Sequence, residues 1–207
     1  MRAYNKIKPI MMGLALIVCS MNSNAITLQS LQNTLSQHAV VRGDFSQQRV
    51  MALFSTPLLS SGTFLLADNH GLIWQQSVPF PTQLRLTKEK LSQSFDDGEP
   101  QIMTAKENPM AFYFSHIFLS LFRGDTDQLH KDFRTELSGD DQEWTLSLIP
   151  KSAPLNAVFS MIEVTGSSYI SRVQLIEIKG DSSIISFNNQ SSTPIALTTK
   201  EIAAFDF

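Results

Sequence analysis

About ten short segments in which apolar and polar residues alternate limit the possible folds of this chain more than any other feature. They cover residues 40–51, 61–67, 72–78, 83–87, 91–95, 133–137, 143–150, 159–164, 171–179 and 183–188. Turn residues separate them, among them Pro79 and Gly180. Residues 202–207 also read as a strand. The pattern predicts a mainly β, α+β fold, in which a large antiparallel sheet curls toward a barrel and leaves an apolar concave face for helices to cover.

One segment, residues 108–123, interrupts the strands with a helical pattern rich in aromatic side chains. Asn108 can cap this helix, Pro109 suits its first turn and Gly124 can end it. One face carries apolar residues at three- and four-residue spacing: Met110, Phe114, Ile117, Phe118, Leu121 and Phe122. Such a stripe fits an ordinary core helix or a lid over an apolar cavity, and the curled sheet favours the lid. Shorter helices are expected at 27–38 and 125–133.

The N-terminus has the layout of a secretory signal peptide. Basic residues precede an apolar run from Ile10 to Cys19, and a small-residue site predicts cleavage after Ala25. Residues 26–207 are then expected to form a single exported domain. Cleavage removes three basic residues, no acidic residue and the only cysteine, so the formal net charge changes from −3 to −6. This acidic chain lacks the basic surface that nucleic-acid binding requires.

The sequence offers no convincing catalytic or metal-binding set. The histidines are His38, His70, His116 and His130, and none has a second ligand at metal-binding spacing. His116 and Ser120 could share a helix face, but no orienting carboxylate or oxyanion hole accompanies them. The acidic clusters at 96–99 and 140–143 fall in predicted hairpin tips, where solvation explains their charge. We therefore expect neither an enzyme nor a cofactor, and an exported hydrolase is the least supported alternative.

Several motifs, taken in order, resemble the LolA-like family of periplasmic lipoprotein carriers. They are FSQQR at 45–49, SGTF at 61–64, LIW at 72–74 followed by Pro79, the run 84–91, WTLSLIP at 144–150, and the runs 173–181 and 184–187. The resemblance covers nearly all of residues 26–207. It implies an unclosed antiparallel β-barrel with helices over its concave face, and an apolar cavity that shields acyl chains.

From this resemblance we expect a monomeric carrier in the periplasm that moves a lipidated protein or lipid-like cargo from an inner-membrane donor complex to an outer-membrane acceptor. The alternative is a non-catalytic adaptor of the same fold that binds a protein partner of an envelope transport or lipid-export system. The predicted cavity wall consists of Phe45, Phe64, Trp74, Leu84, Leu86, Trp144 and Leu146. The predicted lid residues are Phe114, Ile117, Phe118, Leu121 and Phe122. A one-residue error in register would exchange cavity and outer-face side chains.

Two departures from LolA mark the chain as divergent. LolA usually has an Arg-Pro pair shortly before the tryptophan, and its arginine is thought to fasten the lid. Asp68 and Asn69 occupy the corresponding positions here. The sequence also stops at Phe207, without the C-terminal extension of typical LolA. These differences predict a lid held by apolar contact alone, and they leave open whether the cargo is a lipoprotein or another lipid.

Overall fold

The computed structural model describes residues 25–96 and 98–207. Eleven strands lie within them: β1 (Val40–Val50), β2 (Leu58–Ala67), β3 (Gly71–Val78), β4 (Thr82–Leu86), β5 (Lys90–Phe95), β6 (Gln101–Thr104), β7 (Phe133–Gly139), β8 (Trp144–Pro150), β9 (Phe159–Gly166), β10 (Ile170–Glu177) and β11 (Ser182–Ser191). The helices are α1 (Leu28–Ser36), α2 (Pro109–Arg123), α3 (Thr126–Asp132) and α4 (Thr199–Ala204). The predicted signal peptide lies outside the described residues except for Ala25.

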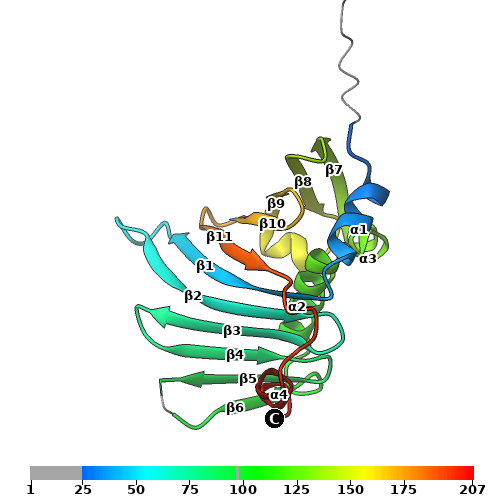
Figure 1. Cartoon of the computed structure of the whole chain (residues 1–207). Helices are drawn as coiled ribbons and strands as arrows, with labels where there is room; N and C mark the ends of the chain where they lie inside the picture. Colours follow the sequence, from blue (N-terminus) through cyan, green and yellow to red (C-terminus); the bar gives the residue numbers. More distant parts are fainter. Residues whose placement is uncertain (1–24, 97) are drawn as a thin grey trace, which may run out of the picture.

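All eleven strands form one antiparallel sheet in the order β6-β5-β4-β3-β2-β1-β11-β10-β9-β8-β7. The pairing of β1 with β11 joins the first half of the chain to the last strand. The sheet bends between its β1–β6 half and its β7–β9 half, and α2 lies beside the bend (Figure 1). Because β6 and β7 end the order without pairing to each other in the described part of the chain, the barrel is open. The predicted fold class is confirmed.

Strand alternation divides the apolar side chains between two faces of the sheet. The larger core occupies the concave face and includes Phe45, Phe64 and Leu72 together with residues of α1, α2 and α3. A smaller cluster, which contains Leu65, Ile73 and Phe205, lies on the convex face. The concave face therefore holds most of the apolar surface, as a curled sheet covered by helices requires.

Helix α2 begins and ends at the predicted residues. The Asn108 side chain accepts a hydrogen bond from the Ala111 backbone N–H at 3.1 Å, and Gly124 adopts a left-handed conformation with φ of 63°. Phe112 and Leu119 are buried on the side of α2 opposite Leu121. This second buried side explains why the apolar surface of α2 is wider than one stripe, since α2 also contacts α1 and α3.

The predicted C-terminal strand at 202–207 is wrong, because residues 199–204 form helix α4. Thr198 and Glu201 make a capping box, in which each side chain accepts a hydrogen bond from the other residue's backbone N–H. The Glu201 carboxylate also forms an ion pair with the Arg42 guanidinium, in which Arg42 Nε lies 2.6 Å from Glu201 Oε1. The hydrogen bond from Arg42 is the main cause that lowers the pKa of Glu201 to about 2. This ion pair fastens α4 to β1.

Candidate functional site

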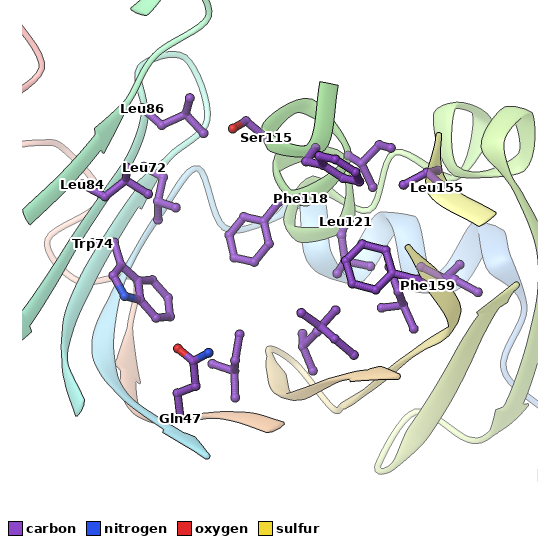
Figure 2. Close-up of a pocket in the computed structure, with 17 residues that line it drawn as sticks. Gln47, Leu72, Trp74, Leu84, Leu86, Ser115, Phe118, Leu121, Leu155 and Phe159 are labelled. Carbon is purple, nitrogen blue, oxygen red and sulfur yellow. The ribbon is translucent and has the colours of Figure 1, made fainter. Parts of the chain in front are cut away.

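An apolar cavity of about 370 Å³ lies between the concave face of the sheet and helix α2 (Figure 2). Its volume falls within the roughly 300–1,000 Å³ typical of ligand pockets. The lining residues are Gln47, Leu72, Trp74, Leu84, Leu86, Phe114, Ser115, Ile117, Phe118, Leu121, Leu148, Leu155, Phe159, Ile162, Val173, Leu175 and Ile185. All but Gln47 and Ser115 are apolar, so the cavity suits a ligand without polar groups along most of its length.

Three walls bound this cavity. Strands β3 and β4 form one of them, where Trp74 pairs directly with Leu84 and Leu72 pairs with Leu86. Phe159 and Leu155 come from the other half of the molecule and lie across the space from Trp74 (Figure 2). Several of these side chains, including Trp74, are only half-buried in the protein. They therefore offer apolar surface that the protein itself leaves unpacked.

Helix α2 provides the third wall. Phe114, Ile117, Phe118 and Leu121 face the space, at the spacing that places them on one side of the helix. The Phe114 ring packs edge-on against Phe159, with ring centroids 6.0 Å apart. This contact joins α2 to β9 across the concave face, so α2 bridges the two halves of the curled sheet.

One of the two polar lining residues, Gln47, lies on β1 next to a charged cluster that is outside the cavity lining. Phe45, Gln47 and Arg49 follow one another on the concave side of β1 in the direction of the β1–β2 turn. The Gln47 amide points into the space (Figure 2). Arg49 lies 3.0 Å from Glu177 and 3.7 Å from Asp181, measured between the side-chain nitrogen and carboxylate oxygens. An amide and a charged cluster thus lie at the end where the turns between β1 and β2 and between β10 and β11 meet.

His116 and Asp140, two of the candidate polar residues considered from the sequence, do not line the cavity. His116 is exposed on α2. Asp140 caps the β7–β8 turn, where its carboxylate accepts hydrogen bonds from the backbone N–H groups of Gln142 and Glu143. Residues 25–96 and 98–207 contain no cluster of three or more potential metal ligands. None of the helices described is long and apolar enough to cross a membrane.

Comparison of the sequence with models of known protein families assigns the chain to a family. The family model described as outer membrane lipoprotein carrier protein LolA-like matches residues 20–193. This chain belongs to the LolA-like family. The match spans the open barrel from α1 to the end of β11, and thus every residue that lines the cavity. No curated protein matches the chain.

The chain is also similar to solved structures of low sequence identity. One is a LolA superfamily protein from Nitrosomonas europaea, 10% identical, with a TM-score of 0.44 over 84% of this chain and 96% of that one. A putative outer membrane lipoprotein-sorting protein domain from Vibrio parahaemolyticus is 8% identical, with a TM-score of 0.47 over 87% and 97%. The MucA/MucB complex of Pseudomonas aeruginosa gives 15% identity and a TM-score of 0.37 over 79% of this chain and 56% of the matched chain.

The structure separates the seven predicted wall residues into three groups. Trp74, Leu84 and Leu86 line the cavity. Phe45 and Phe64 lie behind it: Phe45 stacks on Trp74 with ring centroids 3.7 Å apart, and Phe64 packs edge-on against Phe187 at 5.2 Å. They support the wall without forming its surface.

Trp144 and Leu146, also predicted as wall residues, are fully buried in the β8 region and do not line this cavity. The Trp144 indole N–H donates a hydrogen bond to the Ser167 carbonyl at 2.7 Å. Its ring fills the space over Gly166, where an added Cβ would lie 2.6 Å from the ring. Around Trp144 the concave face is therefore filled by packed protein atoms, where the prediction placed the cavity.

Four of the five predicted lid residues, Phe114, Ile117, Phe118 and Leu121, line the cavity. The fifth, Phe122, packs on Phe187, with centroids 5.2 Å apart, and lines a small separate cleft. The prediction missed the contributions of β9, β10 and β11, namely Phe159, Ile162, Val173, Leu175 and Ile185. Their strands alternate as expected, but alternation alone does not say which half of a curled sheet faces a cavity.

The expectation that apolar contact alone holds α2 is wrong. Arg123, the last residue of α2, lies with its Nε 2.6 Å from Asp68 Oδ1, and its Nη2 also donates to the Asp68 backbone carbonyl. LolA was expected to carry the lid-fastening arginine on the barrel, at the position that Asp68 holds here. In this chain the cation comes from the helix and the acid from the β2–β3 turn, and we call this contact between the end of α2 and the sheet the latch.

Proposed function

We propose that this protein is a periplasmic carrier that shields the acyl chains of a lipoprotein or lipid-like cargo during transfer from the inner to the outer membrane. The observation that carries the proposal is the apolar cavity under α2, in which Gln47 and Ser115 are the polar lining residues. Exposing an acyl chain to water costs about 0.8 kcal/mol for each CH2 group, so a chain that crosses the periplasm needs such a host.

The lining favours one orientation of the cargo. Trp74, Leu84 and Leu86 would contact the acyl chain from the sheet, with Phe114, Ile117, Phe118 and Leu121 covering it from α2. The polar end of the cargo would lie near Gln47, whose side-chain amide lines the cavity and can donate a hydrogen bond to ester or amide oxygens. Ser115 is less available, because its hydroxyl donates to the Ala111 carbonyl at 2.7 Å.

The carrier role requires export. We propose that residues 1–25 act as a signal peptide that is cleaved after Ala25, and that residues 26–207 form one carrier domain. N-terminal sequencing of protein from the periplasmic fraction tests this directly. A sequence that begins at Ile26 is expected, and full-length protein in the cytoplasm would contradict export.

Bound lipid is the first test of the carrier. The mature protein is purified without detergent and extracted with organic solvent, and the extract is analysed for lipid by mass spectrometry. A fluorescent fatty acid is then titrated into the extracted protein. Co-purified lipid or saturable probe binding is expected. If both are absent, the adaptor alternative is favoured instead.

A substitution in α2 tests whether the cavity does the binding. Phe118→Asp places a carboxylate in the apolar space and is expected to abolish probe binding, because an unpaired charge there is strongly unfavourable. The β-rich circular dichroism spectrum should stay unchanged. Phe80→Asp is the matched control, since Phe80 is exposed in the β3–β4 turn, outside the cavity, and should leave probe binding intact. Global unfolding of the Phe118 variant would show that α2 is ordinary core.

A further inference from the structure

The exposed apolar side chains gather at one end of the sheet. Neighbouring strands run antiparallel, so the β1–β2, β3–β4, β5–β6 and β10–β11 connections emerge at the same end. In Figure 1 these connections lie at the left, opposite α1, α2 and α4. They carry a set that we call the apolar rim: Val50, Leu53, Phe54, Leu58, Leu59, Val78, Phe80, Phe95 and Ile178.

The rim residues are strongly exposed. Leu53 is 84% exposed, Phe80 is 74% exposed and Leu59 is 63% exposed. The other large apolar residues with comparable exposure in the described part of the chain are scattered: Ile102, Met110, Ile195 and Ile202. Single exposed apolar residues are ordinary, but a concentration of them along one end marks an interaction surface.

Charge does not explain what this surface binds. Arg49 is engaged by Glu177 and Asp181, which leaves Lys179 as the other basic residue among the four connections. Acidic residues also flank the rim, at Asp96 and Glu99. The rim therefore lacks the cluster of basic residues through which proteins recognise anionic lipid or nucleic acid. Any attraction has to come from burial of the apolar side chains themselves.

The arrangement of the rim side chains favours a lipid bilayer over a folded protein as the partner. Its side chains come from four separate connections and the strand ends beside them, and none of them lines the cavity. A folded protein would need matching pockets at each turn, whereas the interface of a bilayer can admit them all. Gln47, which lines the cavity, also lies on β1 toward this end of the sheet. A membrane at the rim would thus lie on the Gln47 side of the cavity.

We infer that the apolar rim docks the protein on a lipid bilayer by inserting side chains such as Leu53, Phe54 and Phe80 at the level of the headgroups, with no need for anionic lipid. This docking goes beyond the carrier function and can occur without cargo. It explains why apolar residues stay exposed at this end of the sheet.

Vesicle flotation tests the docking. Exported protein is mixed with vesicles of phosphatidylcholine and phosphatidylethanolamine at low and high salt. We expect the wild type to float with the vesicles under both conditions, and Leu53→Ser/Phe80→Ser to bind at least about tenfold more weakly. Ile195→Ser is the matched control, because Ile195 is 78% exposed but lies in the segment that follows β11. It should float like the wild type.

Three outcomes would overturn the inference: a wild type that stays unbound, a double rim variant that floats normally, or binding that requires anionic lipid and is released by salt. A second measurement does not depend on affinity. Phe80→Trp and Ile195→Trp are each made in a Trp74→Phe/Trp144→Phe background, so that the introduced tryptophan is the one that fluoresces. The fluorescence of Phe80→Trp should be quenched by brominated phospholipid, whereas that of Ile195→Trp should not. Equal quenching of both would also contradict insertion of the rim.

The docking proposal and the carrier proposal can be tested independently of each other. Leu53→Ser/Phe80→Ser should bind the fluorescent fatty acid like the wild type when no vesicles are present, because neither residue lines the cavity. Flotation without any probe binding would support membrane docking by the rim and contradict the carrier function. Probe binding without flotation would support the carrier function and contradict the docking.

Discussion

The two tryptophans occupy regions that look alike in sequence and differ in what covers them. Trp74 in β3 and Trp144 in β8 both lie on antiparallel strands of the same sheet, and both face the concave side. Trp144 is 1% exposed and belongs to the packed core. Trp74 lines the cavity. The same strand pattern thus produces solid core in one half of the sheet and an open apolar wall in the other.

The difference lies in the residues opposite each ring. Gly166 pairs with Trp144 and leaves space for its indole, and the Ser167 carbonyl accepts the indole N–H. Trp74 rests on Phe45, but across the cavity its neighbours are α2 and Phe159, which do not close onto it (Figure 2). Stability should therefore concentrate around Trp144 and binding around Trp74.

The largest expected effect is on stability. Trp144→Ala should lower the free energy of unfolding by about 3–5 kcal/mol, because it removes a fully buried aromatic ring and a satisfied hydrogen bond. Urea unfolding followed by circular dichroism measures it. The folded fraction should still bind the fatty-acid probe. A loss below about 1 kcal/mol would break the comparison, since Trp144 would then not behave as core.

Trp74→Ala should have its main effect on binding. Removing the ring takes apolar surface from the cavity wall, and probe affinity should fall about tenfold. The loss of stability should be smaller than for Trp144→Ala, since Trp74 is only half-buried. Trp74→Phe is the control and should retain most of the affinity. Unchanged probe affinity in Trp74→Ala would mean that cargo does not contact this wall.

The smallest effect is expected at the latch that ends α2. Arg123→Met keeps the apolar stem and removes the contacts with Asp68, so it should cost less than about 1 kcal/mol of stability. Stopped-flow measurements should show faster probe release, because the end of α2 is then free to move away from the sheet. Arg134→Met removes the exposed pair of Arg134 with Glu136 on β7 and serves as the control. Identical release rates in the two variants would argue against a latch.

Local patterns in the sequence predict the sheet and α2 well. Alternation places most of the strands, and Asn108, Pro109 and Gly124 bound α2 as predicted. Strand β6 was missed because four residues are too few to show alternation. Alternation was also misleading at α4, where the capping residues Thr198 and Glu201 carry the better signal.

The cavity and the latch depend on contacts that no local pattern encodes. Arg123 and Asp68 lie 55 residues apart and meet only when α2 lies across the sheet. Phe159 and Leu175 sit in ordinary alternating strands, and the curvature of the sheet decides that they face the space under α2. The same curvature separates Trp74 from Trp144. Sequence reasoning could therefore find the concave face but not divide it into core and cavity.

The most direct test of that division asks which tryptophan an acyl chain approaches. Single-tryptophan variants are made by Trp144→Phe, which leaves Trp74, and by Trp74→Phe, which leaves Trp144. Each is titrated with a fatty acid that carries bromine atoms along its chain, and tryptophan fluorescence is recorded. We predict saturable quenching of Trp74 and none of Trp144. Equal quenching of both, or saturable binding that quenches neither, would contradict the assignment of the cavity as the acyl-chain site.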